Sequence, residues 1–169
     1  MKFLGPVLFA LSVSACQGTS PPRSQLEGEP VSFVSLDGYT ISKDRDATIL
    51  TPKDDARKGS TIVIRSVRLD GRNDRSPEEI LVATRASLEA MPEARVSSAA
   101  RVEDSNLEAM QFDLSFEPRS KDGETYERQH VVLFGDAYAF HVLHTAPKGH
   151  LGDLAKDFHR VVETLEEEG

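Results

Sequence analysis

Cys16 is the only cysteine of the chain, and its position limits the part of the chain that is free to fold. It ends a short segment that begins with one positive charge, continues through mostly apolar residues 3–13 and closes with two small residues. This layout is typical of a secretory signal peptide. The apolar run is about half as long as the roughly 20 residues that a membrane-spanning helix needs, so a retained transmembrane anchor is the weaker interpretation. We therefore predict that residues 1–15 are removed.

The residues Val13-Ser14-Ala15-Cys16 resemble the lipobox of bacterial lipoproteins at every position. The resemblance implies attachment of a diacylglycerol to Cys16, cleavage before it and acylation of the new amine, with palmitate among the expected acyl groups. Several chains are needed for stable anchoring, because one chain binds a membrane only marginally. Gln17, not aspartate, follows, which by analogy with the sorting rule of enteric bacteria favours the outer membrane, on its periplasmic face or at the cell surface. The alternative is an ordinary signal peptide with a chance cysteine.

The net charge of the chain limits its possible partners, and its single cysteine limits how the fold can be stabilised. Cleavage removes one lysine from a chain whose formal net charge is −8, so the mature protein is more negative still. Such a chain has no electrostatic footprint for nucleic acid. It is also repelled by anionic lipid, so the lipid on Cys16 must hold it at the membrane. Because that lipid uses the only thiol, no disulfide can form, and the core alone must stabilise the fold.

The mature chain divides into a tether and one domain. Residues 16–30 are rich in Pro, Gly and Ser and contain one large apolar residue, Leu26, so they cannot bury enough surface to offset the entropy of ordering. We predict a flexible tether there and a single domain over residues 31–169. A domain of this size buries about 70% of the surface of its unfolded chain, which is enough for a core.

Two patterns predict the elements of this domain. A capping box at Ser76-Pro77-Glu78-Glu79 opens a helix that Pro92 ends, and apolar residues at helical spacing predict a second helix over residues 151–165, followed by a solvated acidic end. Apolar alternation and β-branched runs predict strands. These strands cover 31–36, 39–41, 47–51, 61–69, 94–102, 107–116, 125–134 and 137–145.

The order of the elements predicts the fold class. Strands that do not alternate regularly with helices favour an α+β fold, an antiparallel β-sheet flanked by two α-helices. The run at 61–69 is expected inside the sheet. The best hairpin signal is Gly135-Asp136 between the last two strands, and both faces of the final strand are fairly apolar, so this hairpin is expected to lie centrally.

A more specific resemblance covers residues 106–165. A strand, a polar loop, the hairpin from residues 130–134 to 138–142 and a helix containing Phe158 are similar to the C-terminal half of the PsbP-like/DcrB-like superfamily. Asp37-Gly38-Tyr39-Thr40-Ile41 fits the family opening, and the capped helix fits too. The resemblance implies a PsbP-like α/β/α sandwich. It implies no common catalytic set, because members mostly act as accessory or binding proteins, some of them lipid-anchored to photosynthetic or bacterial envelope membranes.

The histidines do not predict a metal site. His141 and His144 form a His-x-x-His pattern, but residues three apart on a strand point to opposite faces and cannot share an ion. Packed or surface histidines are the expected outcome. His150 and His159 lie nine apart on or beside the last helix, on different turns, and are also poor partners.

Other candidate chemistry is weak. Residues 70–74 carry oxygen ligands that suit calcium, but the EF-hand spacing is absent and an ordinary polar loop is expected. The sequence has no Gly-x-Ser-x-Gly elbow for a Ser-His-Asp triad, no phosphate loop and no dinucleotide fingerprint. Arg65, Arg68 and Arg57-Lys58 are expected on solvated faces. We predict no catalytic residue, cofactor or metal, and Cys16 as the one site residue.

These observations favour a lipid-anchored envelope protein with a non-catalytic domain, an accessory or binding module for another envelope protein. Anchoring confines such a binder near membrane partners and raises its effective concentration. The alternative is a periplasmic hydrolase or small-ligand carrier that uses a pocket between the sheet and the helices. A deep cavity lined by histidines and carboxylates with shifted pKa values would favour the alternative. A filled core with an exposed apolar patch would favour the first role.

Overall fold

The computed structural model describes residues 21–25, 30–57, 59–69, 75–117 and 124–168. The signal segment, Cys16 and the possible calcium loop at 70–74 lie outside the described residues.

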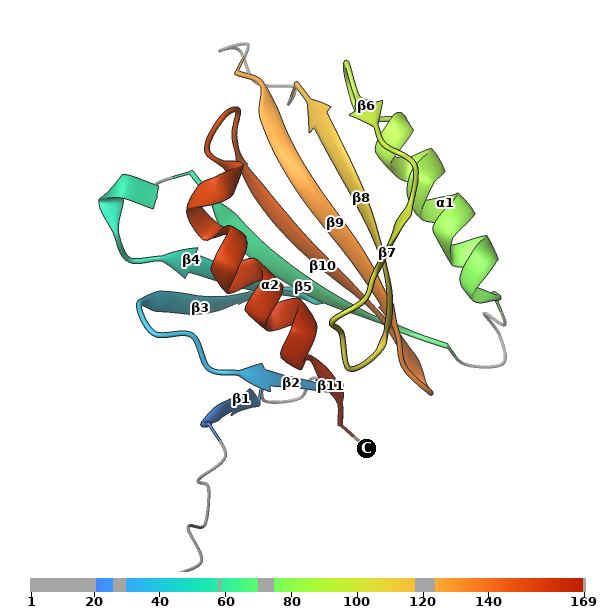
Figure 1. Ribbon diagram of the computed structural model, residues 1–169, viewed down its shortest axis with the longest axis horizontal. Helices are drawn as coiled ribbons and strands as arrows, with labels where there is room; N and C mark the ends of the chain where they lie inside the picture. Colours follow the sequence, from blue (N-terminus) through green and yellow to red (C-terminus); the bar gives the residue numbers. More distant parts are fainter. Residues whose placement is uncertain (1–20, 26–29, 58, 70–74, 118–123, 169) are drawn as a thin grey trace, which may run out of the picture.

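A large antiparallel sheet forms the centre of the molecule (Figure 1). Within the described residues it has eight strands, in the order β3-β4-β5-β10-β9-β8-β6, with β7 also paired to β8. Strand β5 and the β9–β10 hairpin lie inside the sheet, as the sequence predicts. The bounds are β3 (Tyr39–Asp44), β4 (Ala47–Pro52), β5 (Thr61–Arg68), β6 (Arg95–Val96), β7 (Ala100–Val102), β8 (Glu108–Phe116), β9 (Tyr126–Phe134) and β10 (Tyr138–Pro147).

The predicted strand at 94–102 is wrong as a single strand, because a bulge divides it into β6 and β7. Val96 pairs with Leu114 and Ala100 pairs with Gln111, so four steps along one strand meet three along the other. The Ser97 hydroxyl accepts a hydrogen bond from the Asp113 N–H at 2.9 Å at the bulge. A side chain there takes the place of a ladder bond.

Three short strands form a second sheet that the sequence does not predict in full: β1 (Arg23–Gln25), β2 (Val31–Val34) and β11 (Glu166–Glu167). Part of the segment predicted as a tether is therefore ordered as β1. The Arg23 guanidinium donates to the Thr164 carbonyl at 2.8 Å and lies 3.1 Å from the Glu166 carboxylate. The acidic end is a strand and not the solvated tail that the sequence suggested.

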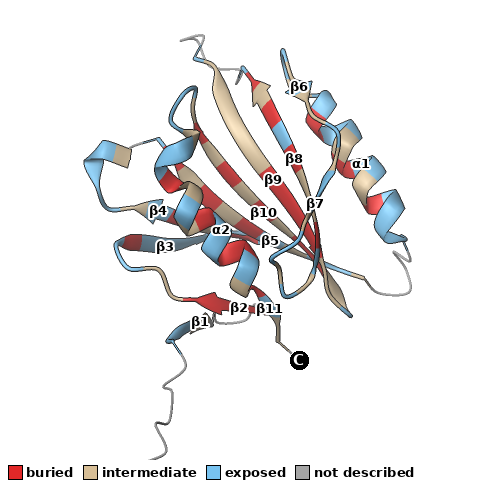
Figure 2. Ribbon diagram, viewed as in Figure 1, coloured by how far each residue is buried: buried red, intermediate tan, exposed pale blue. Residues whose placement is uncertain are grey.

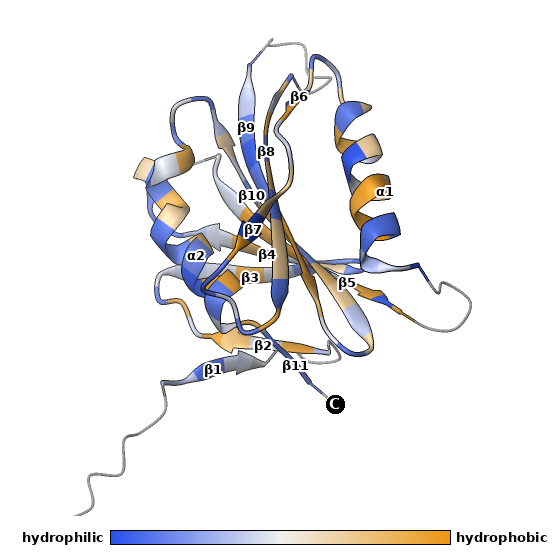
Figure 3. Cartoon of the chain, turned by 45° about the vertical axis from the view of Figure 1, so that its right-hand side comes forward, coloured by the Kyte–Doolittle hydropathy of each residue, from blue (hydrophilic) through white to orange (hydrophobic). Residues whose placement is uncertain are grey.

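Helix α1 (Pro77–Glu89) begins with the predicted capping box. The Ser76 hydroxyl accepts from the Glu79 N–H at 3.3 Å, and the Glu79 carboxylate accepts from the Ser76 N–H at 2.9 Å. Helix α2 (Ala155–Thr164) follows the 3-10 turn η2 (Leu151–Leu154), and η1 (Asp55–Arg57) precedes β5. Figure 3 shows α1 and α2 on opposite sides of the sheet, which confirms the predicted α+β sandwich.

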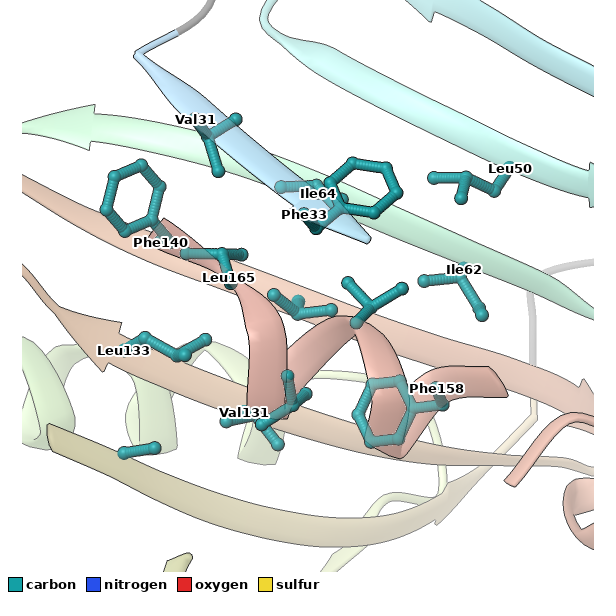
Figure 4. Close-up of a cluster of buried hydrophobic side chains, with 14 of the residues drawn as sticks. Val31, Phe33, Leu50, Ile62, Ile64, Val131, Leu133, Phe140, Phe158 and Leu165 are labelled. Carbon is teal, nitrogen blue, oxygen red and sulfur yellow. The ribbon is translucent and has the colours of Figure 1, made fainter. Parts of the chain in front are cut away.

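The larger core lies on the α2 side of the sheet (Figure 4). Each fully buried Phe or Leu there contributes about 1.5–3 kcal/mol relative to an exposed position. Its labelled members are Val31, Phe33, Leu50, Ile62, Ile64, Val131, Leu133, Phe140, Phe158 and Leu165.

The core under α1 is smaller and covers only part of its face of the sheet. Ile80 and Leu88 of α1 pack against buried side chains that come from β8, β9 and β10, whereas the outer face of the helix is exposed (Figure 2). Strand β5, next to β10, presents Arg65 and Val67 on the same face, and Val67 is 44% exposed. The helix therefore leaves the β5 side of this face open.

Candidate ligand-binding cavity

A cavity of about 440 Å³ lies where α1 leaves the sheet uncovered. Its wall on the helix includes Ile80, Ala83 and Thr84, and its floor comes from β5, β9 and β10. The volume falls in the range of about 300–1,000 Å³ that is typical of small-molecule sites. The pocket that the sequence kept open as an alternative, between the sheet and a helix, is thus present.

Two histidines meet on the floor of this cavity. His130 Nε2 lies 2.9 Å from His141 Nδ1, and the two ring planes make an angle of 64°. The register of the β9–β10 hairpin brings them together, because His141 lies opposite Val132 and His130 is two residues away on the same face. One ring donates and the other accepts, so each tautomer depends on its neighbour.

Both histidines are neutral at neutral pH. Burial lowers the pKa of His130 to about 3, with further lowering from His141, Arg128 and Arg65. Burial also lowers the pKa of His141 to about 4, and the charge of Arg65 adds to this. His130 is 6% exposed, and its Nδ1 has no hydrogen-bond partner among the described residues.

Positive charge surrounds the cavity. Arg65 and Arg68 of β5 and Arg75, directly before α1, line it, and Asp46 is the one carboxylate among its described lining residues. The guanidinium groups of these three arginines form no hydrogen bond or ion pair with other described residues. The rest of the lining is largely apolar, including Val67, Leu69, Ile80, Leu88 and Leu143.

The structure confirms the prediction that His141 and His144 point to opposite faces of β10. His141 faces α1 and the cavity, whereas His144 is fully buried in the opposite core, with its ring 5.4 Å from that of Phe158. His150 instead lies 3.0 Å from Asp153. In the part of the chain that the structure describes, no three His, Cys, Asp or Glu residues gather as metal ligands.

Sequence reasoning missed the His130–His141 pair, because it compared histidines within one element, along a strand or a helix, and not across neighbouring strands. The hairpin signal at Gly135-Asp136 fixes the register across strands, and this register places His130 diagonal to His141. The sequence analysis also placed Arg65 and Arg68 on solvated faces without linking them to a cavity. Arg57 is engaged elsewhere: its guanidinium and the Tyr39 hydroxyl both donate to Asp157, at 3.2 and 2.7 Å. Lys58 lies outside the described residues.

Comparisons with known proteins identify a fold and no family. No protein-family model matches the chain, and no curated protein sequence matches it. Among solved structures, LpqN of Mycobacterium tuberculosis, described as involved in cell envelope biogenesis, is 15% identical with a TM-score of 0.60, over 88% of this chain and 91% of LpqN. CyanoP, the PsbP of the cyanobacterium Synechocystis, is 8% identical with a TM-score of 0.57, over 92% and 98%.

A Bacteroides thetaiotaomicron structure has a TM-score of 0.63 at 17% identity, but the chain spans only 50% of that protein's length while 89% of the chain is covered. At such identities the likeness concerns the fold alone. The match to CyanoP confirms the PsbP-like α+β fold that the sequence predicts. No helix within the described ranges has the length and apolar character needed to cross a membrane.

Proposed function

We propose that this chain is a cell-envelope protein, held at the outer membrane by lipid on Cys16, whose domain binds a ligand without transforming it. The signal segment and the four lipobox residues support export and lipidation. The fold shared with LpqN, a protein involved in cell envelope biogenesis, is compatible with this location. The lipid anchor would then keep the domain close to the membrane surface.

The observation that carries the binding role is the cavity between α1 and the sheet. It has the volume of a small-molecule site, apolar walls and a few convergent polar groups. The same cavity argues for binding over hydrolysis. A general base works best when its pKa lies near the operating pH, and both floor histidines have pKa values of about 3 to 4. Among the described residues, the one side-chain hydrogen bond of these two rings joins them to each other and not to a nucleophile.

An accessory role for another envelope protein is the second candidate. The tether favours it, since anchoring raises the effective concentration of a binder near membrane partners. The described surface exposes three large hydrophobic side chains, Ile41, Val67 and Val82, and Val67 belongs to the cavity. Single exposed apolar residues are normal for a monomer, so the geometry favours the small ligand.

Isolation of the protein from its own membranes tests the binding role. The protein is washed, small molecules are extracted, and they are identified by mass spectrometry from wild type, Ala83→Trp and Ala86→Trp. Ala83 lines the cavity, whereas Ala86 is exposed on the same helix and does not. We expect one organic ligand in wild type and in Ala86→Trp, and its loss from Ala83→Trp. No ligand in wild type, or equal amounts in both variants, contradicts the proposal.

A further inference from the structure

We infer that the cavity selects an amphipathic organic carboxylate, with Arg65 binding the carboxylate and the walls of the cavity covering the apolar body. This inference rests on the proposed binding function and names the ligand class of the same site.

The charge of the cavity opposes the charge of the protein. The chain has a formal net charge of −8, yet the described lining of the cavity holds three arginines and one aspartate. A concave site lined by one sign of charge concentrates ions of the opposite sign. The site therefore attracts an anion, although the protein as a whole repels anions.

Arg65 is placed to hold the headgroup. It lies opposite His141 across the β5–β10 pair and opposite Ala47 of β4, so it stands in the open part of the sheet face. Arg65 lines the same cavity as His130 and His141, and its charge adds to the burial that lowers the pKa of both histidines. The planar guanidinium fork matches a carboxylate in two parallel hydrogen bonds.

The histidine pair completes the polar end of the site without adding charge. A neutral imidazole offers one donor and one acceptor, and the pair uses one of each between its rings. The Nδ1 of His130 is buried and lacks a partner among the described residues, so the floor of the cavity already carries one unsatisfied polar atom. The Nε2 of His141 is the other ring nitrogen that the pair leaves over, and it is not fully buried, so it is the atom of the pair that a polar group of a ligand can reach.

The apolar lining excludes a bare inorganic anion as the favoured ligand. Val67, Leu69 and Leu143 lie beside the arginines, and Ile80 and Leu88 face them from α1. Covering this surface removes apolar area from water, and the gain is proportional to the area covered. A headgroup alone covers none of it, and an uncharged apolar molecule leaves the arginines unpaired. A ligand that has both parts satisfies both sides of the site.

Calorimetric titration with three probes tests the ligand class. The full mature chain is produced with Cys16→Ala, so that no attached acyl chain competes, and is titrated at pH 7.5 and low salt with octanoate, octan-1-ol and acetate. We expect octanoate to bind at least tenfold more tightly than octan-1-ol, and acetate to give no detectable binding. We also expect the affinity for octanoate to fall as salt is added.

Matched arginine variants locate the charge. Arg65→Gln is expected to weaken octanoate at least tenfold and to leave octan-1-ol unchanged, whereas Arg160→Gln, on the exposed side of α2, changes neither by more than twofold. Arg65→Lys keeps the positive charge but loses the planar guanidinium fork. Its affinity for octanoate is expected to lie between those of wild type and Arg65→Gln. Because Arg65 is exposed, the unfolding midpoint of Arg65→Gln should match wild type, and this is measured in parallel.

The outcomes separate this inference from the proposed function. One outcome is that octanoate and octan-1-ol bind equally tightly and that Ala83→Trp abolishes both. This outcome overturns the inference that the cavity selects a carboxylate, but the cavity remains a binding site. Full octanoate affinity in a folded Arg65→Gln protein overturns the role of Arg65. If neither octanoate nor octan-1-ol binds, and no ligand is extracted from the wild-type protein, the inference and the small-ligand function both fall.

Discussion

The His130 ring donates to or accepts from the His141 ring across 2.9 Å, and both rings are held neutral by burial on the floor of one cavity. In the unfolded chain each histidine returns to a pKa of about 6.5. Below that value the unfolded state binds more protons than the folded state, so stability falls as the pH falls.

The first prediction concerns this loss of stability at low pH. These two histidines should leave the free energy of unfolding unchanged well above pH 6.5 and should decrease it steadily from about pH 6.5 down to about pH 4 for His141 and about pH 3 for His130, the window set by the lowered pKa values. Urea denaturation at pH 7.5, 6.5, 5.5 and 4.5 measures it, with His141→Gln showing a shallower decrease. A wild-type stability that stays flat down to pH 4.5 is incompatible with two neutral buried rings.

His144 gives a second prediction, in the other core. It is fully buried beside Phe158, neither ring nitrogen has a hydrogen-bond partner among the described residues, and burial lowers its pKa to about 4. His144→Leu should therefore raise the free energy of unfolding at pH 7.5 by about 1–3 kcal/mol, since it removes unsatisfied polar atoms.

The gain from His144→Leu should grow toward pH 4.5 by up to about 3 kcal/mol, because a change of one pKa unit corresponds to 1.36 kcal/mol. Paired denaturation curves of wild type and variant at both pH values measure this. A destabilised His144→Leu protein at pH 4.5 would show that the ring has a partner that the core provides.

Gly135 carries a third prediction. A Cβ at this position would overlap the Glu167 carboxylate, which accepts a hydrogen bond from the Ala137 N–H at 2.9 Å. Gly135→Ala should displace that carboxylate and cost about 1–3 kcal/mol, as expected for the loss of a charge-assisted hydrogen bond. Gly152→Ala is the matched control, because nothing lies within 4 Å of a Cβ there.

In a double-mutant cycle for this contact, Gly135→Ala should cost much less when Glu167 is already Ala. Thermal and urea unfolding of the four proteins in the cycle supply the data. If Gly135→Ala lowers the free energy of unfolding equally with and without Glu167, the contact between these two residues does not contribute to stability.

Lipidation gives a fourth prediction. Cys16→Ala should release the protein into the soluble periplasmic fraction or stall its processing, because the lipobox loses the sulfur that carries the diacylglycerol. Metabolic labelling with an alkyne palmitate analogue, followed by membrane fractionation, measures both effects. Gln17→Asp is the companion variant, expected to stay labelled and to move toward the inner membrane. Unchanged membrane retention of an unlabelled Cys16→Ala protein argues against the anchor.

Local signals in the sequence were enough for the elements that depend on them. The capping box at Ser76 and Glu79 predicted where α1 begins, and the turn at Gly135-Asp136 predicted the central hairpin. Strands β1 and β11 were missed because they have no local signal in the sequence. Arg23–Gln25 and Glu166–Glu167 are polar and without alternation, and they become strands only because the two edges of β2 are available to pair with them.

The cavity was beyond local signals for a similar reason. Its position depends on where α1 rests on the sheet, over β8–β10 and not over β5, and helical periodicity gives the face of a helix but not its place on a sheet. The arginines at 65 and 68 and the histidine at 130 were visible in the sequence. Only the register across β5, β10 and β9 shows that Arg65 and His130 both neighbour His141.

The most direct measurement of the central claim, that the cavity binds a ligand, is a histidine-ring NMR spectrum recorded while octanoate is added. We expect the ring signals of His130 and His141 to shift and saturate, and the signal of His144, on the opposite face of the sheet, to stay in place. Ala83→Trp should abolish the shifts and Ala86→Trp should keep them. Rings of His130 and His141 that do not respond to octanoate or to octan-1-ol in the folded wild-type protein would contradict the account.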